Sequence, residues 1–194
     1  MVQKSEEDMR REKGFDLIEI KIEDVFRRLL DPVMVTEAEM NDICGSFRRL
    51  STKKIGLFPD TLKVLDVLKR NGKKIYMLSN AQYSFTMHEI RNMGIIEYFD
   101  AIYSSSKEGM KKPYPGFLQK LIDEEDLDKD ETVMIGNDLL SDITIAQRTG
   151  IDSIFLNTFA WDEDRVRKTA KENNFTDSIR YVMDGDLSAI LEDK

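Results

Sequence analysis

Short, mostly apolar runs alternate with helical segments along most of this chain, and this alternation restricts its fold more than any other feature. The runs predict buried strands at residues 75–78, 101–103, 133–135 and 153–156, and a short fifth strand at 181–183. Strands that alternate with helices of this length indicate βαβ units, and hence a parallel sheet covered by helices on both faces. Ligands bind beyond the carboxyl ends of the strands in such sheets. We therefore look there for functional residues.

The first part of the chain has a different pattern. Thr36 and Glu39 form a capping-box pair. Behind them lies an apolar stripe at helical spacing, which predicts a packed helix: Met40, Ile43, Cys44, Phe47 and Leu50. We predict a small helical region at residues 1–55, followed by an α/β core at residues 56–194.

Composition narrows the range of partners. Lys and Arg number 29 and Asp and Glu 37, so the 194 residues carry a net charge of −8. This charge argues against nucleic acid and anionic membranes as partners. The single cysteine, Cys44, cannot form an internal disulfide and favours a reducing compartment. The start is too polar for a signal peptide, and no apolar run approaches the ~20 residues that span a bilayer. We expect a cytoplasmic protein.

Polar side chains follow the first two predicted strands. The first strand ends in Ser79 and Asn80, which could donate hydrogen bonds to a phosphate or could cap the next helix. The loop after the second strand contains Lys112, followed by Pro113. Its ammonium group could neutralise a phosphate, although lysines in loops are usually solvated. Each feature alone therefore allows a functional and a structural interpretation.

The third strand has the more specific ending. The chain turns at Gly136 and Asn137, and Asp138 and Asp142 then follow four residues apart at the start of a helix. Mg²⁺ is typically bound by one or two such carboxylates together with water or substrate oxygens. The structural alternative is helix capping by Asp138 or Ser141.

These three features occur in order, and together they resemble the second, third and fourth motifs of the haloacid dehalogenase-like (HAD) hydrolase superfamily. The resemblance covers roughly residues 56–190, and the helical region before it resembles that superfamily's small cap. It implies an α/β, three-layer Rossmann-like fold with a parallel sheet. It also implies that Ser79 and Asn80 bind the phosphoryl group, Lys112 offsets its charge and that of the nucleophile, and Asp138 and Asp142 hold Mg²⁺.

One family motif is missing from its expected place. The superfamily's first, central strand ends in Asp-x-Asp, and the first aspartate is the nucleophile. Here Met1 already begins in the cap region. Three other segments contain aspartate in a partly similar pattern but do not fit the motif, and we call them decoys: residues 15–18, 126–128 and 184–188. The pattern of the last one predicts a turn and a helix cap. We expect the sequence to be N-terminally incomplete and inactive alone, with two strand edges that lack partners and could self-associate.

The resemblance implies a Mg²⁺-dependent phosphatase for a small phosphorylated metabolite. Three alternatives stay open. One is a haloacid dehalogenase without a metal, and another is a non-catalytic relative that binds a phosphorylated ligand or a protein partner. The third, a Rossmann-type nucleotide binder, is disfavoured because no Gly-x-Gly-x-x-Gly follows any strand.

Overall fold

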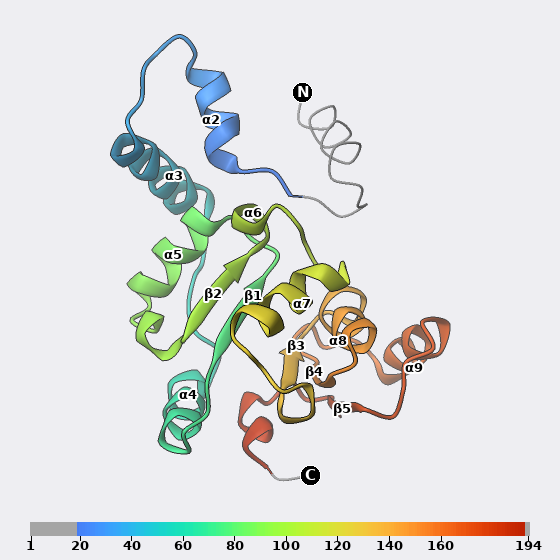
Figure 1. The fold of residues 1–194 in the computed structure, drawn as a ribbon. Coiled ribbons are helices and arrows are strands. Elements are labelled where there is room, and N and C mark those ends of the chain that lie inside the picture. Colours follow the sequence, from blue (N-terminus) through green and yellow to red (C-terminus); the bar gives the residue numbers. More distant parts are fainter. Residues whose placement is uncertain (1–18, 193–194) are drawn as a thin grey trace. The chain divides into compact units, whose positions relative to one another are not determined.

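A computed structural model of the chain describes residues 19–192, and five strands in two parallel sheets form its framework (Figure 1). The strands are β1 (Tyr76–Ser79) and β2 (Ala101–Ser104) in one sheet, and β3 (Val133–Gly136), β4 (Asp152–Leu156) and β5 (Ile179–Val182) in the other. Every pairing is parallel. The predicted α/β class is confirmed, and each strand lies within two residues of its predicted range.

Strands β1 and β3 each have one parallel partner in the described part of the chain. In the described part of the chain, β1 pairs only with β2, in the register Tyr76 with Ala101. Strand β3 pairs only with β4 there, in the register Val133 with Asp152. The unpaired edges expected from the sequence, and self-association through them, stay predictions.

The chain divides into two compact units. The first comprises residues up to 57 together with 72–111, and the second comprises residues 58–71 and 112–194. The boundary between a cap and a core at residues 55 and 56 stays a prediction. No helix within residues 19–192 has the length and hydropathy needed to cross a membrane.

The first unit combines the β1–β2 sheet with helices from the predicted helical region and from the segment between the strands. Its helices are α2 (Ile22–Leu30), α3 (Glu37–Ser51), α5 (Tyr83–Asn92), the short α6 (Ser105–Glu108) and the 3-10 turn η1 (Ile96–Tyr98). The predicted capping box is present, because the Glu39 N–H donates to Thr36 Oγ1 and the Thr36 N–H donates to Glu39 Oε2. Met40 and Cys44 are buried, as the stripe predicted, whereas Leu50 in the last turn of α3 is 86% exposed.

The second unit is built around β4, whose side chains alternate between the two faces of its sheet. Phe155 packs on one face in a cluster with Leu139, Ile143, Val166 and Ile179. On the other face Ile154 and Leu156 pack with Val182, against Ile135 and Leu187. The sheet of this unit therefore has apolar clusters on both faces, as the continuous apolar runs predicted.

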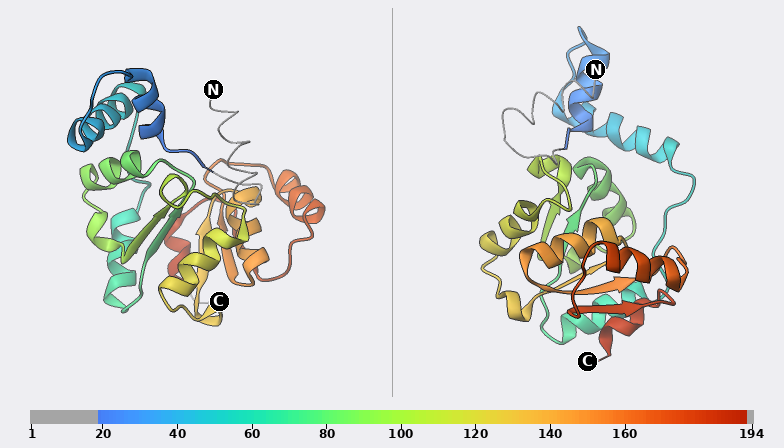
Figure 2. Two further views of the ribbon diagram at one scale, coloured as in Figure 1. Left: turned by 45° about the horizontal axis from the view of Figure 1, so that its top comes forward. Right: turned by 90° about the vertical axis from the view of Figure 1, so that its right-hand side faces the viewer.

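The described part of the second unit also contains four helices and three short helical turns (Figure 2). They are α4 (Thr61–Arg70), α7 (Pro115–Glu124), the π-helical turn η3 (Leu139–Ile143), α8 (Thr144–Thr149), α9 (Glu163–Glu172) and the 3-10 turns η2 (Lys129–Glu131) and η4 (Leu187–Leu191). Turn η3 and helix α9 contribute to the Phe155 face. Turn η4 contributes to the opposite face.

Candidate functional site

The turn after β3 carries the acidic pair predicted from the sequence. Asp138 is the N-cap of η3, and its Oδ1 accepts a hydrogen bond from the Leu140 N–H at 2.9 Å. The capping interpretation is therefore confirmed for Asp138. Within residues 19–192 no donor is bonded to the other oxygen, Oδ2, so that oxygen has remaining capacity to accept a ligand.

Asp142 lies behind this turn and is 6% exposed. Its Oδ2 accepts hydrogen bonds from the backbone N–H groups of Asn137 at 3.0 Å and Asp138 at 3.1 Å. Its Oδ1 lies 2.7 Å from Lys112 Nζ. Both carboxylate oxygens are thus satisfied by donors of the second unit, and the backbone turn between β3 and η3 is fixed to Asp142.

Lys112 is held in the interior of the second unit. Its side chain is only 9% exposed and forms the ion pair with Asp142. The alternative of a solvated loop lysine is therefore wrong. A buried carboxylate needs both a countercharge and hydrogen bonds to be tolerated. Lys112 and the two backbone N–H groups provide these to Asp142.

Gly136 and a π-helical turn bring Asp142 into this position. A Cβ on Gly136 would lie 2.3 Å from both Cβ and Oδ2 of Asp142, so only glycine leaves room for that side chain. The wider π turn is stabilised by Thr144, whose Oγ1 donates to the Leu139 carbonyl at 2.9 Å. Single π turns of this kind are frequent at functional sites. The glycine and the turn together explain how Asp142 faces back toward the end of β3.

Ser79 and Asn80 lie at the tip of β1, in the first unit, whereas Lys112, Asp138 and Asp142 belong to the second. The N-cap of the next helix, α5, is Gln82, and it forms no side-chain cap hydrogen bond. The interpretation of Ser79 or Asn80 as the cap of that helix is therefore wrong. Their predicted contact with a phosphoryl group stays a prediction.

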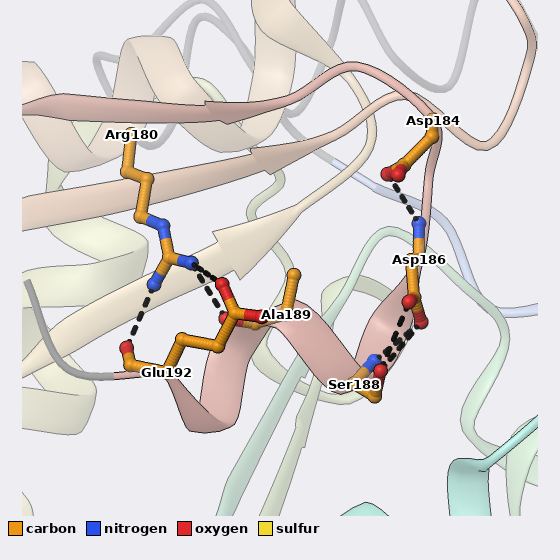
Figure 3. Close-up of polar contacts among 6 residues, drawn as sticks. All are labelled: Arg180, Asp184, Asp186, Ser188, Ala189 and Glu192. Atoms are coloured by element: carbon orange, nitrogen blue, oxygen red, sulfur yellow. Dashed lines mark hydrogen bonds and ion pairs between the residues drawn. The ribbon is translucent and has the colours of Figure 1, made fainter.

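The decoy at residues 184–188 is a turn (Figure 3). Asp184 Oδ1 accepts from the Asp186 N–H at 3.0 Å, and Asp186 Oδ1 accepts from the Ser188 N–H at 2.8 Å. Hydrogen bonds from the backbone N–H and the hydroxyl of Ser188 hold the pKa of the Asp186 carboxyl below its usual range. The predicted turn and N-cap are confirmed, with η4 as the helix that they begin.

Of the other two decoys, the structure describes only the one at residues 126–128. Asp126 has a positive φ of 51°, and Asp128 caps η2 by accepting from the Asp130 N–H at 2.9 Å. These two residues form a turn, although η2 makes the acidic stretch more ordered than the predicted loop. The decoy at residues 15–18 lies outside the described residues.

Two polar residues that were not predicted as site residues, Asn157 and Thr158, follow β4. The buried Asn157 donates to two backbone carbonyls, and Thr158 Oγ1 accepts from Asn137 Nδ2 at 2.8 Å. Thr158 is thereby connected to the residue directly before Asp138. A signal for them was present, because both are polar residues at the carboxyl end of a predicted strand.

The side chains at this site could supply part of the coordination shell of Mg²⁺. Among residues 19–192 there is no group of three or more His, Cys, Asp or Glu side chains that could hold a metal. Mg²⁺ does not require one, because it often takes one or two protein carboxylates and completes its shell with water and phosphate oxygens. Asp138 has an oxygen available for this, whereas Asp142 is engaged by Lys112 and the backbone. The residues present therefore fit a partial magnesium site.

Comparison with known proteins establishes the family. The model of the haloacid dehalogenase-like hydrolase family matches residues 2–156. The chain belongs to this family. The family resemblance and the fold predicted from the sequence are thereby confirmed. A HAD phosphatase from Thermococcus onnurineus has a similar fold, with a TM-score of 0.60. Its sequence is 20% identical, and the match covers 87% of this chain and 69% of that one.

Curated relatives of this HAD-family chain are phosphatases. It is 25% identical to a ribulose-1,5-bisphosphate 5-phosphatase from Halopiger xanaduensis, over 54% of this chain and 44% of that protein. It is 26% identical to a glyceraldehyde 3-phosphate phosphatase from Methanothermobacter thermautotrophicus, over 64% of this chain and 56% of that protein. The matches span only about half the length of these relatives.

Proposed function

We propose that this HAD-family chain belongs to a Mg²⁺-dependent phosphatase that acts on a small phosphorylated metabolite. The observation that carries the proposal is the buried ion pair of Lys112 and Asp142, 2.7 Å apart, directly behind the Asp138 turn at the end of β3. A fixed cation next to an available carboxylate suits a phosphate and a divalent metal. Phosphatase activity in the curated relatives supports the same assignment.

Each residue has a distinct role in this proposal. Lys112 Nζ would neutralise charge on the transferring phosphoryl group, and Asp142 would orient that ammonium group. Asp138 would bind the metal directly through Oδ2, and Asp142 would act on it at most through water. A bound Mg²⁺ supplies Lewis-acid stabilisation of the phosphoryl oxygens. The family resemblance assigns hydrogen bonds to a phosphoryl group to Ser79 and Asn80, and we keep that role as a proposal.

Binding is the appropriate first measurement for this chain. The two decoys that lie within residues 19–192, at 126–128 and 184–188, both form turns. We expect the 194-residue chain to bind Mg²⁺ and phosphate, and binding can be measured whether or not the chain turns over a phosphate monoester.

Calorimetric titration with Mg²⁺ tests the metal site. Asp138→Asn should weaken Mg²⁺ binding by about tenfold or more, since it removes a ligand charge. Asp177→Asn is the matched control. Asp177 is an exposed aspartate just before β5, at the opposite end of the strands, so its replacement should leave binding unchanged. Equal effects of the two substitutions would indicate only a general charge effect.

Titration with inorganic phosphate in the presence of Mg²⁺ tests the role of Lys112. Lys112→Met should abolish phosphate binding, whereas Lys168→Met, which removes a 76% exposed lysine from α9, should not. Unchanged phosphate binding in Lys112→Met would refute the proposed site. Phosphate binding without any need for Mg²⁺ would favour a non-catalytic phosphate binder instead.

A further inference from the structure

The loop that follows β4, residues 157–161, is fixed by a buried asparagine. Asn157 is 4% exposed, and its Nδ2 donates to the carbonyls of Trp161 at 2.8 Å and Met183 at 3.0 Å. Its Oδ1 accepts from the Trp161 N–H at 2.9 Å. One side chain thus closes the loop on itself and attaches it to the segment after β5. The loop is therefore held in one conformation.

Thr158 attaches the same loop to the candidate metal turn. Asn137 Nδ2 donates to Thr158 Oγ1 at 2.8 Å, and Asn137 is the residue directly before Asp138. The two residues come from turns after neighbouring strands, β3 and β4. The position of the loop relative to Asp138 is therefore set by a direct hydrogen bond.

Two aromatic residues on this loop have opposite environments. Trp161 packs against the Phe155 cluster, and the Arg165 guanidinium lies 3.8 Å from its ring centroid. Phe159 is 64% exposed, between Thr158 and Ala160, whose φ is +51°. Non-glycine residues with positive φ are uncommon and often mark functional segments. Phe159 is therefore the more exposed of the two rings, and Trp161 is partly buried.

We propose that Phe159 is a specificity-determining residue that contacts the carbon skeleton of the phosphorylated ligand. The inference rests on the proposed function, because the phosphate would be bound by Lys112 and the metal at Asp138. Phe159 is one residue from Thr158, which is bonded to the turn that carries Asp138. An exposed ring at this position would cover apolar CH groups of the ligand and exclude water from them. The ligand class is a phosphate monoester with an apolar carbon chain next to the phosphate.

The test compares two ligands on the 194-residue chain with Mg²⁺ present. Inorganic phosphate probes the phosphate site alone, and n-butyl phosphate adds an unbranched alkyl chain. Dissociation constants come from NMR titration, and saturation transfer to the butyl protons reports direct contact. Phe159→Ala should weaken n-butyl phosphate binding by about tenfold, because apolar contact is lost. It should change inorganic phosphate binding by less than about twofold, because the two sites are separate.

Two further variants make the result specific. Phe159→Leu keeps an apolar side chain and should retain most of the preference for n-butyl phosphate. Val133→Ala removes exposed apolar surface at the amino end of β3, away from the strand ends that carry the site, and should affect neither ligand. Fluorescence of Trp161, the only tryptophan, checks that the loop remains folded.

The possible results distinguish the proposed function from the role of Phe159. Wild-type protein that binds neither ligand would overturn the proposed function and this inference with it. Wild-type protein that binds both ligands equally, or a Phe159→Ala variant that retains the preference, would overturn only the role of Phe159. A Phe159→Ala variant that loses both ligands to the same extent would show that the residue supports the loop rather than the ligand.

Discussion

Gly136→Ala is the substitution for which the structure gives the sharpest expectation. An ideal Cβ at this position would lie 2.3 Å from Cβ and Oδ2 of Asp142 and 2.4 Å from its Cγ. Real Cβ contacts are not this short, and the atoms concerned are close to the backbone of a buried residue. Asp142 cannot rotate away without leaving Lys112 and two backbone N–H groups. The added methyl group therefore breaks the whole set of contacts.

The magnitude follows from these contacts. Forcing an extra carbon into a packed site costs about 1–3 kcal/mol, and disrupting a buried ion pair costs about 3–5 kcal/mol when one partner is lost. Asp142 is displaced in the variant but still present, so we expect the free energy of unfolding to fall by about 3 kcal/mol. With a urea m-value of about 2 kcal/mol/M, the denaturation midpoint should fall by about 1.5 M.

Urea denaturation followed by Trp161 fluorescence measures this effect in the second unit. Gly56→Ala is the control for exchanging glycine for alanine, since no atom lies within 4 Å of a Cβ there. The same Gly136→Ala change in an Asp142→Gly background should cost less than about 1 kcal/mol, because the clashing side chain is gone. An undiminished cost in that background, or a loss in the wild-type background no larger than that of Gly56→Ala, would refute the reasoning.

Three other predictions concern the ion pair, the cysteine and the capping box. Lys112→Met should lower the free energy of unfolding by about 3 kcal/mol, as it leaves the Asp142 carboxylate buried without its countercharge; a loss below about 1 kcal/mol in urea denaturation would contradict this. Burial raises the pKa of the Cys44 thiol, so little thiolate is present at pH 8.5. Iodoacetamide should therefore label the folded protein far more slowly than the protein in urea. Equal labelling rates by mass spectrometry would be inconsistent with a buried thiol. Thr36→Ala should cost about 1 kcal/mol by removing the cap from α3, whereas Thr36→Ser should cost little; equal midpoints for the two variants by circular dichroism would argue against the box.

Much of the framework could be predicted because it depends on local patterns. Apolar runs such as Ile154–Leu156 identified the strands to within two residues, because a strand buried on both faces needs consecutive apolar side chains. The Thr36 and Glu39 capping box is likewise a short-range motif. Leu50 did not follow its stripe into the core, since periodicity shows which residues share a helix face and not how far along that face the contacts extend.

The candidate site was only partly predictable. Asp138 and Asp142 could be recognised as metal-binding or capping residues from their spacing, but not distinguished from one another. The structure separates them, because Asp142 is bonded to Lys112 and the backbone while Asp138 Oδ2 accepts no hydrogen bond within the described chain. This difference depends on a loop far away in the sequence and on the space left by Gly136.

By itself, the sequence determined the parallel α/β framework and the kinds of side chain at its strand ends, because both follow from composition over a few consecutive residues. The tertiary structure alone decided which of those side chains meet. It brought Lys112 to Asp142 and Asn137 to Thr158, and it packed Trp161 against the Phe155 cluster while leaving Phe159 exposed. Such pairings depend on how the chain returns from one strand to the next, and no local pattern records that path.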